Sequence, residues 1–308
     1  MPRVSVIIPT YRHPEYVLKA IESVFSQTYT DHEVIVINDG SPDNTGELLK
    51  PLSDSGRIQY IEQSNAGQAA ARNRGITEAK GEFVAFLDDD DSWPPDKLAW
   101  QIEVLENSPQ AVVVYGYAEI RCGNHRGRQP ASTGPSGNIF SQFAQNGYIR
   151  SPGQTLIRRD HLVRIGGFDS TLWGVDDWDL WLRLTALGEF IYEDRLALIY
   201  LEHENNATLK FHKMFKNAKK VRCKHFRKIE SRHLYQPSGD FVRGFVTWDG
   251  IRCVNQLLDA KQRLEAFRCI LLLLYISRGK FGFGHQLQRW GSRTFNAVCR
   301  RIKIYTSS

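Results

Sequence analysis

Several of the signals that identify common protein classes are missing from this chain of 308 residues. Cysteine is scarce: the five cysteines are odd in number and show no C-x-x-C spacing, so we expect reduced thiols in a cytosolic compartment. The longest apolar run covers residues 269–276, far below the roughly 20 residues that a membrane-spanning helix needs. The N-terminus leads directly into a predicted strand, so no signal peptide is expected. No G-x-G-x-x-G follows that strand, which disfavours a dinucleotide-dependent dehydrogenase.

The charges are distributed unevenly along the chain. Residues 1–208 contain 18 Lys and Arg against 29 Asp and Glu, whereas residues 209–308 contain 22 against 5. The formal net charge of +6 therefore combines an acidic body with a strongly basic C-terminal region. A block this basic is typical of segments that face phosphate groups, whether of an anionic membrane, a nucleic acid or a phosphorylated substrate.

Strand and helix patterns alternate in the first third of the chain. Short apolar runs predict strands over residues 3–9, 33–38, 57–62 and 82–87. Pro14 stands at a favoured first position of one helix, and an Ala-rich helix follows Gly67. This alternation predicts an α/β fold with a mostly parallel central sheet flanked by helices.

The later patterns add strands and end in a helical extension. We expect helices over 96–106 and 158–165 and from Asp176 onward, and strands over 111–120, 153–157 and 192–203. Residues 121–138 are rich in Gly, Arg, Ser and Pro and predict a flexible loop. From about Leu209 the sequence is basic and helical, with an amphipathic stretch at 255–280.

Four consecutive carboxylates, Asp88 to Asp91, follow the strand predicted at 82–87. Adjacent carboxylates near a protein surface repel one another by about 1 kcal/mol per close pair, so a cluster at a strand terminus favours a bound cation. Oxygen ligands suit a hard divalent ion such as Mg²⁺ or Mn²⁺, which completes its coordination with water and substrate phosphates. The cluster therefore predicts a metal–diphosphate site, with a solvated acidic loop as the alternative.

Polar side chains also follow two other predicted strands. Thr10 and Tyr11 come after the first strand, and Asp39 and Ser41 after the second. In open parallel sheets, ligands bind beyond the carboxyl ends of the strands. The three loops together predict a nucleotide-type ligand lying across that edge of the sheet.

Six separated motifs give the chain a resemblance to a known enzyme family. The motifs are Val6-Ile7-Ile8-Pro9-Thr10-Tyr11, Asn38-Asp39-Gly40-Ser41 with Asp43 and Thr45, Asn65-x-Gly67 leading to Ala71-Arg72-Asn73-x-Gly75, Phe86-Leu87-Asp88-Asp89-Asp90-Asp91, Gly166-Gly167-Phe168-Asp169, and Asp176-Asp177-Trp178-Asp179-Leu180-Trp181-Leu182-Arg183. With these motifs the chain resembles, over residues 3–208, the inverting nucleotide-sugar glycosyltransferases of family 2, which have the Rossmann-like GT-A fold.

The resemblance implies a domain organisation. Residues 1–208 would form a GT-A glycosyltransferase domain, with a nucleotide-binding half at about 1–108 and an acceptor half at about 109–208. Residues 209–308 would form a basic helical C-terminal region outside the resemblance.

For the donor, the resemblance implies a UDP-sugar whose base contacts the first two loops. Pro9, Thr10 and Tyr11 would line the base pocket. Asp39 would accept the uracil N3–H in a charge-assisted hydrogen bond, with a helix cap or Asx turn as its alternative role. Arg12 stands where the family often has Asn.

The resemblance also implies roles on the diphosphate side. Arg72 would reach the uracil or the diphosphate, with Arg74 as its competitor. Asp88 or Asp89 would contact the ribose.

For the metal, the resemblance implies Asp90 as the ligand of Mn²⁺ or Mg²⁺. His203, after the last predicted strand, would complete the metal or phosphate site, with ordinary packing as the alternative. Asp91 would cap the turn that follows the cluster.

Inversion requires a carboxylate on the face of the sugar opposite the leaving group. The resemblance places this general base at Asp177, with Asp176 as the alternative. The family's Glu-Asp pair is Asp176-Asp177 here, which leaves the assignment open between the two. Both acids also suit a helix N-terminus without any catalytic role.

The function expected from the resemblance is metal-dependent transfer of a sugar from a UDP-sugar to an acceptor hydroxyl, in cell-surface polysaccharide or lipid-linked glycan synthesis. The acceptor would be a saccharide or lipid-linked saccharide. The protein would be cytoplasmic, with residues 209–308 contacting an anionic membrane surface peripherally. One alternative is a nucleotidyltransferase, although residues 10–13 lack the glycines of a phosphate loop. Another is a nucleic-acid-binding protein acting through the basic region, although the body is acidic and no nucleic acid is expected.

Overall fold

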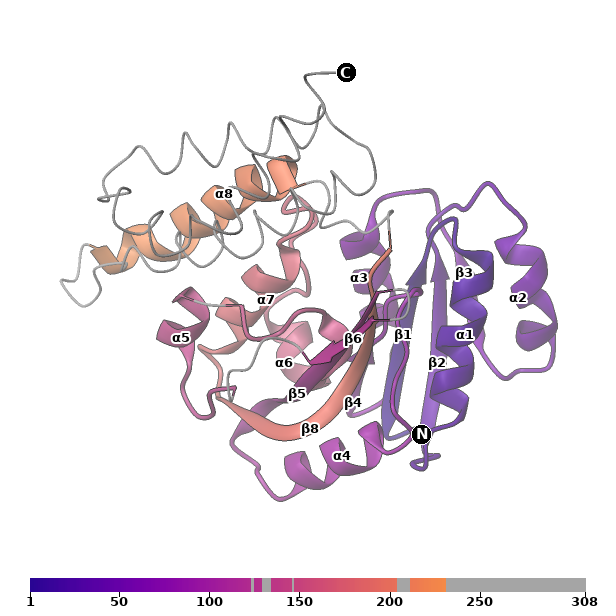
Figure 1. The fold of residues 1–308 in the computed structure, drawn as a ribbon, viewed down its shortest axis with the longest axis horizontal. Helices are drawn as coiled ribbons and strands as arrows, with labels where there is room; N and C mark the ends of the chain where they lie inside the picture. The colour runs from indigo at the N-terminus through magenta and orange to yellow at the C-terminus, as the bar shows by residue number, and fades with distance from the viewer. Residues whose placement is uncertain (123–124, 129–133, 146, 204–210, 231–308) are drawn as a thin grey trace. The chain divides into compact units, whose positions relative to one another are not determined.

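The computed structural model describes residues 1–122, 125–128, 134–145, 147–203 and 211–230 (Figure 1). The chain divides into two units, residues 1–203 with 216–238 and residues 204–215 with 239–308. All described strands belong to the first unit, and only residues 211–215 of the second are described. The predicted domain boundary at residue 208 and the amphipathic stretch at 255–280 lie outside the described residues.

One eight-stranded sheet forms the centre of the first unit. Its strands lie in the order β3-β2-β1-β4-β7-β5-β6, and β8 pairs with β5. Strands β3, β2, β1 and β4 are parallel to one another, and β8 is parallel to β5. Strand β7 is antiparallel to both β4 and β5, and β6 is antiparallel to β5. The strands are β1 (Val4–Thr10), β2 (His32–Asn38), β3 (Gln59–Glu62), β4 (Phe83–Phe86), β5 (Ala111–Cys122), β6 (His125–Arg128), β7 (Thr155–Arg158) and β8 (Glu189–Leu201).

Helices connect these strands and flank the sheet (Figure 1). They are α1 (Pro14–Phe25), α2 (Thr45–Asp54), α3 (Gln68–Glu78), α4 (Lys97–Glu106), α5 (Phe140–Gln145), the 3-10 helix η1 (Pro152–Gln154), α6 (Arg159–Arg164), α7 (Asp176–Leu184) and α8 (Phe211–Glu230). Among the described residues, no helix combines the length and the apolar character needed to cross a lipid bilayer.

Alternate residues of β1 face two different helical layers, because successive side chains of a strand point to opposite faces. Val4, Val6 and Ile8 belong to a buried cluster that also contains apolar residues of α1 and α4. Ile7 points the other way, toward α3. A Cβ atom at Gly75 of α3 would lie 2.3 Å from the Ile7 Cγ2 atom, so the absence of a side chain allows this helix to approach the strand. Helices therefore cover both faces of the sheet.

The α/β architecture with a mostly parallel sheet is confirmed, and two parts of it differ from the predictions. Residues 125–128, predicted as loop, form β6, which pairs with residues 119–122 of β5. The sequence of β6 has no β-branched or aromatic residue, and its pairing depends on the backbone hydrogen bonds that a neighbouring strand supplies. Helix α5 lies in a stretch for which the sequence predicts no element.

Candidate functional site

The loops after β1, β2 and β4 meet at one edge of the sheet, as the sequence predicts. The Asp39 amide donates a hydrogen bond to the Thr10 carbonyl oxygen at 2.9 Å, which joins the first two loops. The Tyr11 amide donates to Asp89 Oδ2 at 3.2 Å, which joins the first loop to the carboxylate cluster. Polar groups from three strands are thus gathered where parallel sheets bind ligands.

In the predicted base pocket, Pro9 and Thr10 are buried at the end of β1, whereas Tyr11 is 37% exposed. The Arg12 guanidinium lies 5.0 Å from the centroid of the Tyr11 ring. The φ angle of Arg12 is 63°, in the left-handed region that residues other than glycine rarely adopt. Tyr11 is therefore partly open to solvent in the turn after β1, with the Arg12 guanidinium close to its ring.

The Asp39 carboxylate is buried and already accepts several hydrogen bonds. Its Oδ1 atom accepts from Gln63 Nε2 at 2.7 Å and from the Ala66 amide at 2.9 Å, and Oδ2 accepts from the Gly67 amide at 2.8 Å. A carboxylate has about four acceptor positions, so one remains at Oδ2. Asp39 thus fastens the loop before α3 and keeps one acceptor position for a ligand N–H.

The four adjacent aspartates of the cluster have different partners. Asp88 pairs with Arg72 Nη2 at 2.5 Å and accepts from the Ser151 hydroxyl at 3.1 Å. Asp89 lies 3.0 Å from His13 Nδ1. Burial raises the pKa of Asp89, and the hydrogen bond to Asp89 raises the pKa of His13. These two carboxylates therefore hold the surrounding loops together.

The other two aspartates contact the end of β8. His203 Nε2 lies 2.9 Å from Asp90 Oδ2, which brings the two predicted metal ligands together across 113 positions of sequence. Asp91 accepts from the Leu201 amide at 3.0 Å, and burial raises its pKa well above the usual range. Asp91 thereby fixes the segment that carries His203.

A divalent cation fits the residues around Asp90. Within the described ranges, no three or more His, Cys, Asp or Glu side chains are arranged to hold a metal ion. Asp90 and His203 supply one carboxylate oxygen and one imidazole nitrogen at neighbouring positions. Mg²⁺ and Mn²⁺ at phosphate-binding sites commonly take one or two protein ligands and complete their coordination with water and phosphate oxygens. The pair therefore suits a cation shared with a diphosphate.

Arg72 connects the carboxylate cluster to α7. Its side chain is 1% exposed, and its Nη1 atom lies 3.2 Å from Asp176 Oδ2 while Nη2 contacts Asp88. The guanidinium also lies 5.2 Å from the centroid of the Phe168 ring. Both terminal nitrogens are thus occupied by protein carboxylates, and the donor contact expected for Arg72 stays a prediction.

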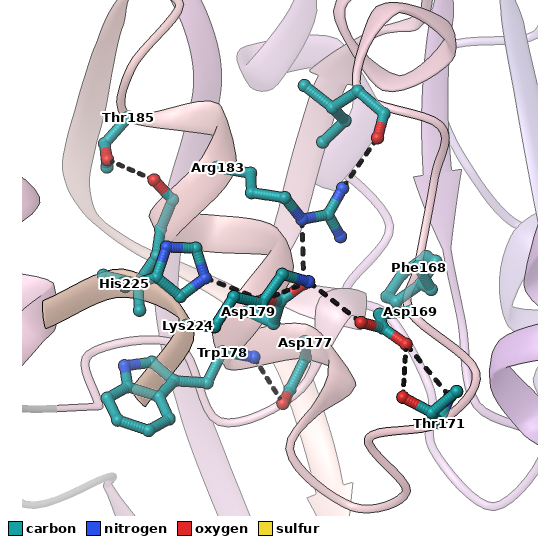
Figure 2. A network of polar contacts seen from close by, with 12 residues as sticks. Phe168, Asp169, Thr171, Asp177, Trp178, Asp179, Arg183, Thr185, Lys224 and His225 are labelled. Carbon is teal, nitrogen blue, oxygen red and sulfur yellow. Dashed lines mark hydrogen bonds and ion pairs between the residues drawn. The ribbon is translucent and has the colours of Figure 1, made fainter. Parts of the chain in front are cut away.

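The two candidate bases begin α7 in different environments. Asp176 is 1% exposed, pairs with Arg72, and accepts from the Gly174 amide at 3.2 Å. Asp177 keeps part of its surface open to solvent and accepts from the Trp178 amide at 2.7 Å (Figure 2). Desolvation by the surrounding protein, together with the neighbouring Asp176 charge, raises the pKa of Asp177 to about 7.

An aromatic cluster beside the predicted metal ligands, Asp90 and His203, was missed by the sequence reasoning. Tyr16 of α1 stacks on His203 with ring centroids 5.6 Å apart, and the His13 ring lies 5.9 Å from that of His203. Ser151, the hydrogen-bond donor to Asp88, was also missed. No motif links these residues to their partners, because the contacts join positions far apart in the sequence.

The Glycosyl transferase family 2 model matches residues 5–166 of this chain, which is more than half of its length. An uncharacterized glycosyltransferase from Nostoc sp. is 37% identical over 181 residues, which cover 56% of this chain and 56% of the relative. The chain spans less than two thirds of the length of the curated relatives from Rickettsia and Nostoc that it matches, from 26% to 62%.

Two solved structures share the fold at low sequence identity. Staphylococcus aureus TarS 1-349 in complex with UDP-GlcNAc gives a TM-score of 0.57 at 17% identity, covering 92% of this chain and 93% of the other. The mannosyltransferase PcManGT from Pyrobaculum calidifontis, in complex with GDP-Man and Mn²⁺, gives 0.56 at 17% identity, covering 98% and 84%. The predicted GT-A fold is thereby confirmed.

Replacing Arg72 tests its bridging role. We expect Arg72→Ala to lower the free energy of unfolding by about 3–5 kcal/mol, because Asp88 and Asp176 lose their shared partner. Urea denaturation measures the change. Arg74→Ala on the same helix is the control: Arg74 is 51% exposed and pairs with Glu78, so a change below about 1 kcal/mol is expected. Equal effects of the two substitutions would contradict the bridge.

Proposed function

The chain belongs to glycosyl transferase family 2, and we propose that it transfers a sugar from a UDP-sugar to an acceptor hydroxyl with inversion at the anomeric carbon. The observation that supports this most directly is the Asp88–Arg72–Asp176 bridge. It joins the carboxylate cluster, suited to a metal-bound diphosphate, to the helix that presents Asp177. In this proposal the leaving-group site and the base would be linked through one buried guanidinium.

On the donor side, the base would contact Tyr11 and Asp39. The remaining acceptor position of Asp39 Oδ2 suits an imide N–H, which uracil has at N3. The exposed Tyr11 ring offers an apolar face to the base. The neighbouring folds contain UDP-GlcNAc in one case and GDP-Man in the other, so the uracil preference is a proposal about this chain's own residues.

On the diphosphate side, Asp90 and His203 would hold Mn²⁺ or Mg²⁺. When bound, such an ion neutralises charge on the departing nucleoside diphosphate. Asp88 and Asp89, fixed by Arg72 and His13, would hold the ribose side.

On the acceptor side, Asp177 would be the general base. In its ionised form it takes the proton of the acceptor hydroxyl while that oxygen bonds to the anomeric carbon and the bond to the diphosphate breaks. A pKa of about 7 leaves a substantial ionised fraction at neutral pH and a usable affinity for the proton. Asp176 is less suited, because its carboxylate is buried against Arg72.

We propose a saccharide or lipid-linked saccharide as the acceptor, in polysaccharide or lipid-linked glycan synthesis on the cytoplasmic side of a membrane. Residues 209–308 contain 22 Lys and Arg against 5 Asp and Glu. Lys216 of α8 is exposed. Basic residues of this kind attract anionic lipid headgroups, so this region would contact the membrane peripherally.

Donor use is tested by nucleotide release. Incubating the protein with Mn²⁺ and a panel of UDP-sugars and GDP-mannose should release UDP from at least one UDP-sugar. Asp90→Asn should weaken metal-dependent donor binding about tenfold or more, because even loss of an outer hydrogen-bond partner costs metal affinity about 10–100-fold. Calorimetry with and without EDTA measures this. Failure of every UDP-sugar to bind in the presence of metal would rule the proposal out.

The base assignment is tested by substitution and by pH. Asp177→Asn should leave donor binding intact and lower transfer by about 10²–10⁴-fold. In the wild type, kcat/KM should fall as the pH drops through about 7, because protonation removes the base. Initial-rate measurements from pH 5 to 9 check this. Transfer that persists in Asp177→Asn, with Asp176→Asn inactive, would move the role to Asp176.

Membrane contact is tested by partition onto vesicles containing phosphatidylserine. Each lysine near an anionic surface contributes about 1 kcal/mol, and Lys216→Glu changes the charge by two, so it should weaken partition by about 2 kcal/mol, or roughly thirtyfold. Added salt should weaken partition further. Lys50→Glu is the control, since Lys50 is 71% exposed on α2, outside the basic region. Partition that is indifferent to salt and to Lys216→Glu would contradict the proposal.

A further inference from the structure

Helix α8 lies beyond the residues that the family model matches, yet part of it packs on the first unit. Ala218 and Val221 of α8 are 6% and 0% exposed. The Asn217 side chain, also buried, donates to the Trp173 carbonyl oxygen at 3.0 Å. Trp173 precedes α7 by three positions, so α8 contacts the loop that leads into the candidate base.

Two side chains of α8, the Lys224 ammonium and the His225 imidazole, converge on one buried carboxylate of α7 (Figure 2). Asp179 has a side-chain exposure of 0% and lies 3.0 Å from Lys224 Nζ and 2.7 Å from His225 Nε2. Arg183, one turn further along α7, contributes its Nε atom at 2.8 Å. Lys224 also bridges to Asp169 at 2.9 Å, which ties the preceding loop to the same point.

These contacts keep Asp179 charged. Although burial acts to raise the pKa of Asp179, the hydrogen bond from His225 and the charges of Arg183 and Lys224 lower it to about 2. A buried carboxylate without such partners is strongly unfavourable. The Asp179 carboxylate in the first turn of α7 is therefore stabilised by Arg183 from its own helix and by Lys224 and His225 from α8.

The three aspartates in the first turn of α7 therefore differ in their ion-pair partners. Asp176 pairs with Arg72 from α3, and Asp179 pairs with Arg183 of α7 and Lys224 of α8 and hydrogen-bonds to His225. Asp177 has no ion-pair partner among the residues that the structure describes and accepts a hydrogen bond from the Trp178 amide. The ion pairs of Asp176 and Asp179 hold the turn in place. Asp177 lies between them in sequence and can exchange a proton without breaking an ion pair.

We propose that Lys224 and His225 are positioning residues, which hold the first turn of α7 so that Asp177 faces the acceptor hydroxyl. This inference rests on the proposed function, in which Asp177 is the base. It also makes α8 part of the catalytic unit, although the sequence predicts that the glycosyltransferase domain ends at residue 208. Helix α8 is then required for turnover and not for donor binding, because its contacts are with the acceptor-side helix.

The test uses the full chain with Lys224→Met and His225→Ala, assayed for transfer with a UDP-sugar that the wild type uses. We expect kcat to fall at least tenfold in each variant, while the KM for the donor and the affinity for UDP change less than twofold. The conservative replacements Lys224→Arg and His225→Gln retain hydrogen-bond donors and should recover most of kcat. Lys50→Met, the same change at an exposed lysine of α2 outside the basic region, should behave as wild type.

Thermal unfolding of each variant is measured alongside the kinetics, with assays run at a temperature where every variant is folded. An unchanged kcat in both variants would overturn the inference, and so would a loss that appears mainly as a higher donor KM or that Lys224→Arg fails to restore. A wild type that transfers no sugar would instead contradict the proposed function. The two failures are therefore distinguishable.

Discussion

A single buried guanidinium holds the two halves of the candidate site together. Arg72 lies in the Ala-rich helix α3, which strand β4 separates from the carboxylate cluster in sequence. Its Nη2 atom pairs with Asp88 and its Nη1 atom with Asp176. Desolvating an arginine is costly unless its N–H groups find charged partners. Each carboxylate is in turn stabilised by the arginine. The loop after β4 and the first turn of α7 are therefore held in a fixed position relative to each other.

The need of buried charges for charged or hydrogen-bonding partners also explains how one site accommodates so many acids. Asp88 and Asp176 share the Arg72 guanidinium, Asp89 lies beside His13, and Asp179 pairs with Arg183 and Lys224. The cationic partners offset part of the negative charge that the aspartates bring to the site. Asp90 and Asp177 differ from these. Asp90 has an imidazole beside it in a position that suits a shared cation, and Asp177 has a raised pKa without a cationic partner among the described residues. The other acids hold segments of the site together, and we propose that Asp90 and Asp177 take part in the chemistry.

Much of the fold and part of the site could be predicted from the sequence. The alternating strands and helices indicated a parallel sheet, and the rule that ligands bind at carboxyl ends of strands brought Tyr11, Asp39 and the carboxylate cluster to one edge. The nearness of Asp90 and His203 was also expected, through the family resemblance. The antiparallel β7, the pairing of β6 and the roles of His13, Ser151 and α8 could not be predicted, because each depends on a contact with a distant segment.

The sequence by itself determined the fold class and the residue types available for chemistry, because periodicity and motif spacing are local properties of the chain. Only the tertiary structure decided what each carboxylate does. Asp88, Asp89, Asp90 and Asp91 are identical side chains at consecutive positions, yet their partners are an arginine, two histidines and a backbone amide from three different parts of the chain. Ionisation and role depend on burial and on neighbouring charges, and these exist only once the chain has folded.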